Sequence, residues 1–177
     1  AAENGLVIGF VGRLLEWKGP KLFLEAFAEL FKTYSNLNLV FVGDGSDREN
    51  LEKLSRSLGV EKKVYFAGFS QNVASWYRTF DIFVHASIEA EPFATTVVEA
   101  SFAKLPIVAT DTGGTREFVE DGVSGLLIKP EKESMVVALK SLIDSEVLRK
   151  QLGEMAYEKA GQDFTEEKIT KEFEQVY

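Results

Sequence analysis

Six short apolar runs alternate with helical patterns along this chain, and this order constrains the fold more than any other feature of the sequence. Most residues in each run are apolar, which is typical of strands buried on both faces of a parallel sheet. The predicted strands are residues 6–11, 37–42, 64–67, 81–86, 106–109 and 125–128. The predicted helices are residues 20–31, 47–58, 72–80 and 92–103, and most of the chain beyond Pro130 is also expected to be helical. Pro92 opens the helix 92–103. We therefore expect an α/β, doubly wound, Rossmann-like domain: a six-stranded parallel sheet with helices on both faces.

Composition excludes several classes of function. The chain has no cysteine and one histidine, His85, which argues against a thiolate zinc site, a cysteine nucleophile or a histidine-rich metal site. Its 28 acidic and 20 basic residues give a net charge of −8, which is unlike a general nucleic-acid surface. We expect neither a bound metal nor a nucleic-acid partner.

The sequence predicts no transmembrane segment and no signal peptide. No apolar run approaches the ~18–20 residues of a membrane-spanning helix, and the first five residues, Ala1 to Gly5, lack the pattern of a signal peptide. With no internal repeat or linker, residues 1–177 are expected to form one domain. We expect a cytoplasmic location.

Two cations follow the first predicted strand. Ligands of open α/β sheets bind beyond the carboxyl ends of the strands, so residues in these positions are candidates for a site. Arg13 and Lys18 lie between Gly12 and Pro20, just before a predicted helix N-terminus, a setting that favours an anion such as phosphate. The segment matches neither the dinucleotide-binding fingerprint nor the P-loop. The alternative is a solvated loop whose cations pair with surface acids.

Two carboxylates, Glu91 and Glu99, follow the fourth predicted strand. A glycosidase pair is disfavoured, because such carboxyls stand ~5–9.5 Å apart across the scissile bond, and these positions do not obviously provide that. Glu99 is suited to accept hydrogen bonds from the diol of a ribose. The alternative is that Glu91 is a favourable charge at a helix N-terminus and Glu99 a solvated surface residue. The apolar neighbours of Glu99, among them Phe102, indicate that much of this helix is buried.

Two further features have open interpretations. Gly113-Gly114 follows the fifth predicted strand, where glycines either allow a ligand to approach the backbone or only serve the turn. His85 lies inside an apolar strand, which favours a hydrogen-bonded core histidine over a catalyst.

Taken in order, these segments resemble the C-terminal half of the retaining glycosyltransferases of family four, which have the two-domain glycosyltransferase-B fold. The resemblance covers nearly the whole chain. It rests on Gly12-Arg13-Leu14 with Lys18-Gly19, Val42-Gly43-Asp44-Gly45, Phe66-Ala67-Gly68-Phe69, Glu91-Pro92-Phe93 with Glu99-Ala100, Pro106-Ile107-Val108-Ala109, Gly113-Gly114 with Glu117, and Gly122 with Gly125-Leu126-Leu127.

The resemblance implies a binding site for a nucleotide-diphosphate-sugar donor, which is a substrate and not a cofactor. Arg13 and Lys18 would neutralise the diphosphate and assist its departure, Glu91 would contact hydroxyls of the donor sugar, and these three form the implied catalytic set. Glu99 would hold the ribose. The other implied donor-binding positions are Gly12, the turn Gly68-Phe69 beside the base, and the backbone around Phe93, Ala94 and Thr95. Ala94 and Lys104 stand where the family commonly has glycine.

The implied reaction is metal-independent transfer of the sugar to an acceptor with retention of configuration. The resemblance begins within the C-terminal domain at Leu6, so the acceptor-binding N-terminal domain would be a missing partner from the same chain, and any membrane association would depend on it. We expect the isolated chain to bind donor weakly and to be inactive. The alternatives are a non-catalytic nucleotide-sugar-binding or scaffold domain, and a nucleotide-sugar epimerase or hydrolase of the same fold.

Overall fold

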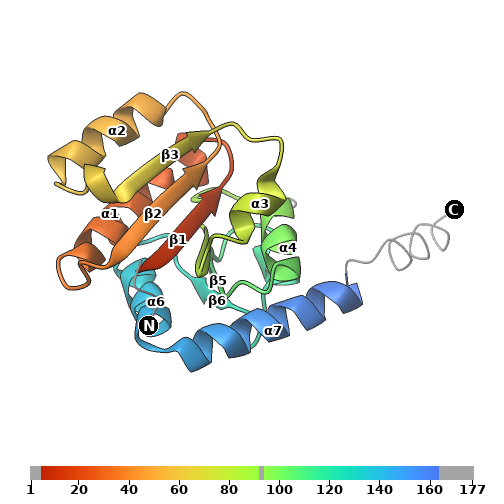
Figure 1. Ribbon diagram of the computed structural model, residues 1–177. Coiled ribbons are helices and arrows are strands. Elements are labelled where there is room, and N and C mark those ends of the chain that lie inside the picture. Colours follow the sequence, from red (N-terminus) through yellow and green to blue (C-terminus); the bar gives the residue numbers. More distant parts are fainter. Residues whose placement is uncertain (1–4, 92–93, 164–177) are drawn as a thin grey trace, which may run out of the picture.

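A six-stranded sheet with only parallel pairings forms the centre of the molecule (Figure 1). The computed structural model describes residues 5–91 and 94–163. The strands are β1 (Leu6–Val11), β2 (Leu37–Val42), β3 (Val64–Gly68), β4 (Ile82–His85), β5 (Ile107–Thr110) and β6 (Leu126–Ile128). Their order across the sheet is β3-β2-β1-β4-β5-β6. The predicted doubly wound parallel sheet is confirmed.

Helices fill the connections between these strands. They are α1 (Pro20–Phe31), α2 (Arg48–Ser57), α3 (Val73–Tyr77), α4 (Thr95–Phe102), α5 (Thr115–Phe118), α6 (Lys132–Asp144) and α7 (Glu146–Asp163), with single 3-10 turns at Glu16–Lys18 and Glu61–Lys63. Helix α4 begins later than the sequence predicts, because Ala94 has the non-helical angles φ −87° and ψ 67°. The predicted helix start at Pro92 lies outside the described residues.

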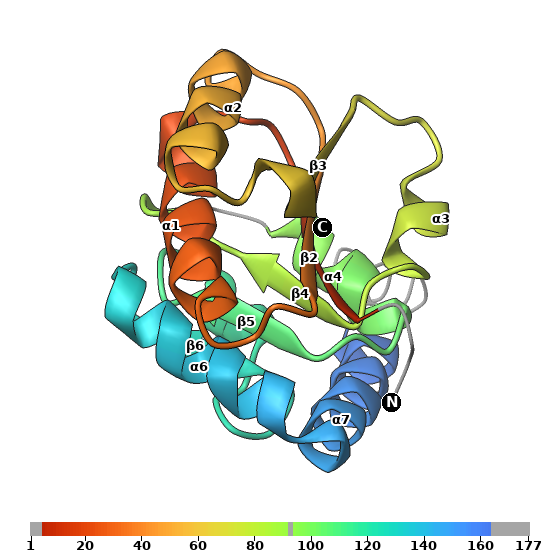
Figure 2. The same ribbon diagram turned by 60° about the vertical axis from the view of Figure 1, so that its left-hand side comes forward.

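The helices form two layers, one on each face of the sheet (Figure 2). Helices α1, α2 and α6 bury one core with alternate strand residues such as Ile8 and Phe41. Helices α3 and α4 bury a second core with the intervening residues, such as Val40 and Phe83, and α7 packs against α4. Successive side chains of a strand point to opposite faces, so a strand covered on both sides must be apolar at almost every position. This explains the continuous apolar runs in the sequence.

The order of the strands creates a switch point between β1 and β4. The chain builds β1, β2 and β3 outward in one direction, and then returns to place β4 on the other side of β1. Connections after β1 and β4 therefore leave the sheet toward opposite faces, and open α/β sheets have their ligand-binding crevice at the carboxyl ends of two such strands. The segments 12–19 and 86–91, which carry the predicted phosphate-binding cations and Glu91, follow β1 and β4 at this edge of the sheet.

Candidate functional site

The loops that follow β1 and β4 are in direct contact. Gly19 adopts φ +68° and lies so close to the β4 loop that a Cβ atom added to it would stand 2.0 Å from the carbonyl oxygen of Ala86. The amide of Ile88 donates a hydrogen bond of 2.8 Å to the carbonyl oxygen of Trp17. Glycine is needed here both for its conformation and for the absence of a side chain. Backbone contacts thus hold the two loops against each other.

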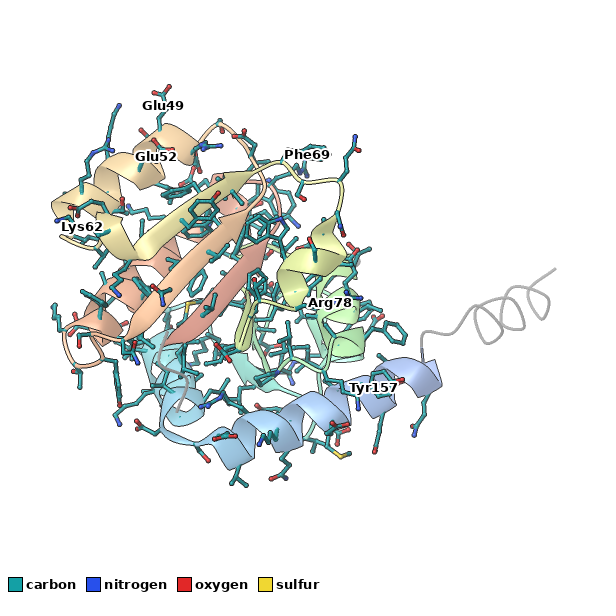
Figure 3. The ribbon with its side chains drawn as sticks, viewed as in Figure 1. Glu49, Glu52, Lys62, Phe69, Arg78 and Tyr157 are labelled. Atoms are coloured by element: carbon teal, nitrogen blue, oxygen red, sulfur yellow. The ribbon has the colours of Figure 1, made fainter. Side chains whose placement is uncertain are left out.

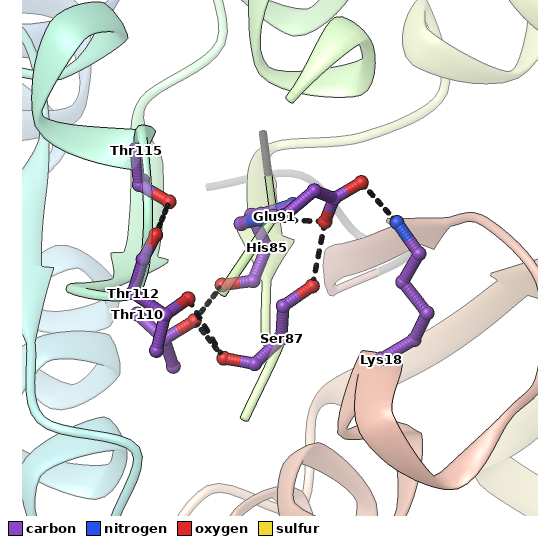
Figure 4. Close-up of polar contacts among 7 residues, drawn as sticks. All are labelled: Lys18, His85, Ser87, Glu91, Thr110, Thr112 and Thr115. Atoms are coloured by element: carbon purple, nitrogen blue, oxygen red, sulfur yellow. Dashed lines mark hydrogen bonds and ion pairs between the residues drawn. The ribbon is translucent and has the colours of Figure 1, made fainter. Parts of the chain in front are cut away.

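Lys18 and Glu91 form an ion pair across these loops (Figure 4). Lys18 Nζ donates to Glu91 Oε1, and the two side chains are only 15% and 12% exposed. The ammonium also lies 4.3 Å from the centre of the Trp17 ring, a favourable cation–π distance. Ser87 Oγ donates to Glu91 Oε2 at 2.8 Å. Burial raises the pKa of Glu91, but the contacts with Lys18, Ser87 and His85 outweigh it, and the net shift of the Glu91 pKa is downward.

A third loop, which follows β5, contacts the backbone of Glu91. The amide of Gly114 donates to the carbonyl oxygen of Glu91 at 3.1 Å. A Cβ atom on Gly113, where φ is +56°, would lie 2.6 Å from the Glu91 nitrogen. The paired glycines therefore allow a close backbone approach to Glu91, which is the local role that the structure gives them.

His85 is a site neighbour that the sequence analysis assigned to the core. Its side chain is 5% exposed, and its Nε2 lies 3.4 Å from Glu91 Oε2. That nitrogen is the only buried side-chain polar atom without a hydrogen-bond partner among the residues that the structure describes. Burial lowers the pKa of His85 to about 4, with Glu91 opposing this shift and Lys18 adding to it. His85 is buried as expected, but its Nε2 lacks the hydrogen bond expected of a core histidine.

Arg13 lies on the same loop as Lys18 but extends toward solvent. Its guanidinium carbon is 5.4 Å from the centre of the Trp17 ring, so the two cations share one aromatic neighbour. Its side chain is exposed, whereas that of Lys18 is largely covered. The structure therefore leaves Arg13 exposed and Lys18 largely covered on the same loop.

Glu99 occupies a separate position on α4. Its carboxylate accepts a hydrogen bond of 2.8 Å from the hydroxyl of Tyr77 on α3, and it borders a groove of about 720 Å³ between these helices. Burial, followed by the hydrogen bond and charge of Glu99, raises the pKa of Tyr77. Glu99 itself is exposed and Phe102 is 45% exposed. The expectation that much of this helix is buried is wrong on this side, because its buried face consists of Val97, Ala100 and Ser101.

The remaining predicted positions lie at the carboxyl edge or on α4. Gly12 and Gly68 belong to a row of backbone contacts, with Gly12 N donating to Val42 O at 2.9 Å and Gly43 N to Gly68 O at 2.8 Å. Phe69 follows β3 and is 78% exposed (Figure 3). Ala94 is buried and Thr95 exposed at the start of α4. The predicted contact at Phe93 lies outside the described residues.

A larger hollow, of about 960 Å³, lies at the opposite edge of the sheet, where Leu6, Asn36 and Asp81 line it. This is the amino edge, which open α/β sheets do not use for their principal ligands. Within residues 5–91 and 94–163 there is no group of three or more histidine and carboxylate side chains arranged to hold a metal ion. None of the helices in this described part is long and apolar enough to cross a membrane.

Comparison with protein families assigns the chain. Residues 1–159 match the model of the family described as glycosyl transferases group 1. The chain belongs to this family of glycosyltransferases. It is 32% identical over 171 residues to the lipopolysaccharide core biosynthesis glycosyltransferase LpsE of Rhizobium meliloti, covering 96% of this chain and 49% of LpsE. The glycosyltransferase chain thus spans about half the length of this relative.

Solved structures of related glycosyltransferases have the same architecture. Anabaena HepE in complex with UDP and glucose superposes with a TM-score of 0.91 at 28% identity, covering 98% of this chain and 48% of HepE. The C-terminal domain of the group 1 protein LpcC from Francisella tularensis superposes with a TM-score of 0.84 at 29% identity, covering 91% of this chain and 87% of that domain. The predicted glycosyltransferase-B, Rossmann-like fold and the predicted transferase class are confirmed.

Proposed function

We propose that this glycosyltransferase chain binds the nucleotide-diphosphate-sugar donor for transfer of the sugar to an acceptor. The observation that carries the proposal is the meeting of Lys18 and Glu91 at the switch point between β1 and β4. A cation there suits a diphosphate, and a carboxylate beside it suits the hydroxyl groups of a sugar. HepE, which has been solved with UDP-glucose, has the same fold over 98% of this chain, and this supports the proposal.

The donor would lie along the carboxyl edge of the sheet. Lys18 and Arg13 would neutralise the diphosphate, and Glu91 would accept hydrogen bonds from the donor sugar. The exposed carboxylate of Glu99, already oriented by Tyr77, is free on its solvent side to bind the ribose. Phe69, exposed at the end of β3, would lie beside the base.

We propose that transfer is metal-independent and proceeds with retention of configuration. Support for the first point comes from the two cations at the crevice, which supply positive charge where the leaving diphosphate accumulates negative charge. Donor binding should therefore be unchanged by EDTA. Retention rests on the resemblance to family four and is tested by NMR of the anomeric proton in the product of the full-length enzyme.

We further propose that this chain binds donor without turning it over, because it covers about half of LpsE and of HepE. A domain supplied by the rest of the full-length protein would bind the acceptor and complete the cleft. Multiple turnovers by the chain alone would contradict this part of the proposal.

Isothermal titration calorimetry with UDP, GDP, ADP and the matching monophosphates tests donor binding. We expect Lys18→Met to weaken diphosphate binding about tenfold or more, and to affect monophosphates less, because a charge-assisted hydrogen bond contributes about 1.5–3 kcal/mol. Glu99→Gln should weaken both nucleotide classes by a similar factor, since both contain the ribose.

Matched controls are available on the surface (Figure 3). Lys62→Met and Glu49→Gln remove the same charges from exposed positions of the 3-10 turn Glu61–Lys63 and of α2, and should leave binding unchanged. Failure of every nucleotide to bind would overturn the proposed function. Unchanged binding in Glu99→Gln would remove Glu99 alone from the site.

A further inference from the structure

The Nε2 atom of the His85 imidazole is buried beside the carboxylate of Glu91 and makes no hydrogen bond within the described part of the chain. The side chain is 5% exposed. Leaving a buried polar atom unpaired costs about 1–3 kcal/mol, so an apolar residue would serve a purely structural role better. Glu91 Oε2, at 3.4 Å, is the carboxylate oxygen that the structure places beside this nitrogen.

The segment that carries His85 is held rigidly. Thr110 Oγ1 donates to the carbonyl oxygen of Ser87 at 2.6 Å and lies 3.3 Å from the carbonyl oxygen of His85 (Figure 4). Thr112 Oγ1 donates to the same carbonyl oxygen of Ser87 at 3.2 Å. The backbone from β4 into its loop is thus tied to β5 and its loop. These bonds hold the backbone that carries the imidazole in place beside Glu91.

The carboxylate of Glu91 has partners that a ligand would change. Lys18 holds Oε1, and Ser87 donates to Oε2. A diphosphate that attracts Lys18 would leave a carboxylate of 12% exposure with one neutral hydroxyl donor. Such a carboxylate needs a replacement donor, because a half-satisfied buried charge is costly.

We propose that His85 is a positioning residue for Glu91: when the donor diphosphate draws Lys18 away, His85 Nε2–H donates to Glu91 Oε2 and keeps the carboxylate directed at the donor sugar. This inference rests on the proposed function. It requires no covalent step and no proton transfer, because a neutral imidazole can donate from Nε2. Glu91 and Lys18 are the charged groups that face the ring, from the β4 loop and the β1 loop. Since Glu91 raises the pKa of His85 and Lys18 lowers it, moving Lys18 away also favours the protonated form.

The single histidine makes the test direct. An untagged, ¹⁵N-labelled chain gives imidazole signals from His85 alone, so its tautomer and titration can be followed by long-range ¹H–¹⁵N spectra. We expect the free chain to titrate near pH 4. Saturation with whichever of UDP, GDP or ADP binds most tightly should raise this midpoint by about one pH unit or more and place the neutral-state proton on Nε2.

Variants separate positioning from a structural role. His85→Gln retains an N–H donor near the Nε2 position, whereas His85→Phe retains a ring without one. We compare the tightest-binding nucleoside diphosphate with its glucose conjugate by calorimetry. His85→Phe should reduce the extra affinity for the glucose conjugate about tenfold, which corresponds to about 1.4 kcal/mol, and His85→Gln should restore most of it. In a Glu91→Gln background, His85→Phe should have no further effect.

Each result has a definite meaning. If the nucleotide binds and the His85 signals do not change, or if His85→Phe weakens both ligands equally, the positioning role is wrong while the proposed function stands. If no nucleotide binds the wild-type chain, both proposals fail. Thermal unfolding of each variant identifies a loss of fold, and the spectra of the wild-type chain test the proposal independently of any substitution.

Discussion

The buried imidazole of His85 should make the stability of this chain fall as the pH decreases from about 6.5 toward 4. Burial lowers the pKa of His85 from 6.5 to about 4. The unfolded chain therefore binds a proton more readily than the folded one between these values, and the stability gained from the neutral imidazole is complete above pH 6.5 and is lost as the pH falls toward 4. A shift of this size is equivalent to about 3 kcal/mol in total, of which about 2 kcal/mol is lost between pH 7 and pH 5.

Urea unfolding at pH 7, 6 and 5 measures this difference. The wild-type free energy of unfolding should fall by about 2 kcal/mol over this range, and that of His85→Gln should remain nearly constant because the variant has no histidine. The pKa of Glu91 is lowered from 4.5, so its own contribution is lost below this range. Glu49→Gln, an exposed substitution on α2, should follow the wild-type profile. Parallel profiles for wild type and His85→Gln would refute the assignment of a buried, neutral imidazole.

Two further substitutions test the contact between the β1 and β4 loops. Gly19→Ala should lower the free energy of unfolding by at least about 2 kcal/mol, because the new Cβ would combine left-handed backbone strain with a collision at the carbonyl oxygen of Ala86. Gly59 also has a positive φ, +71°, but no atom lies within 4 Å of an added Cβ, so Gly59→Ala should cost only the strain, about 1 kcal/mol. Equal losses in urea unfolding would show that the loops are not in close contact. Lys18→Met should lower the free energy of unfolding by about 2 kcal/mol, because the Glu91 carboxylate loses its cation. Adding Glu91→Gln should recover part of this loss in the same assay. If the losses of the two single variants simply add in the double variant, the ion pair is contradicted.

The fold could be predicted because each strand by itself has the apolar pattern of a strand that is buried on both faces. The runs Leu6–Val11 and Leu37–Val42 are mostly apolar, so each predicts a strand buried on both faces whichever strands lie beside it. The ends of the elements do not follow from this pattern, because local backbone geometry decides them. Lys104 shows this well: it adopts φ +59° in the turn after α4, a conformation that suits the glycine common in the family, while its ammonium pairs with Glu154 at 2.8 Å.

The site could be predicted only in part, because its contacts depend on which strands are neighbours. Lys18 and Glu91 are 73 positions apart, and they meet because β4 lies beside β1, which no local pattern specifies. The same applies to His85, whose apolar neighbours suggest a core residue. Its position as the last residue of β4, two residues before Ser87, is the available signal, since ligands of open α/β sheets bind beyond the carboxyl ends of the strands.

The pairing of Lys18 with Glu91 also affects which anions the proposed site would select. An anion that replaces the carboxylate on Lys18 exchanges one ion pair for another and leaves Glu91 buried without a cation, so a simple anion gains little. In the proposed function, a nucleotide-diphosphate-sugar would supply both replacements at once: its phosphates would take Lys18, and its sugar hydroxyls would donate to Glu91. The additional hydrogen bond proposed for His85 would lower the cost of the exchange only when Lys18 has moved. Because Lys18 and Glu91 already neutralise each other, the proposed site should favour a ligand that carries an anion and a polyol at the correct separation over a simple anion.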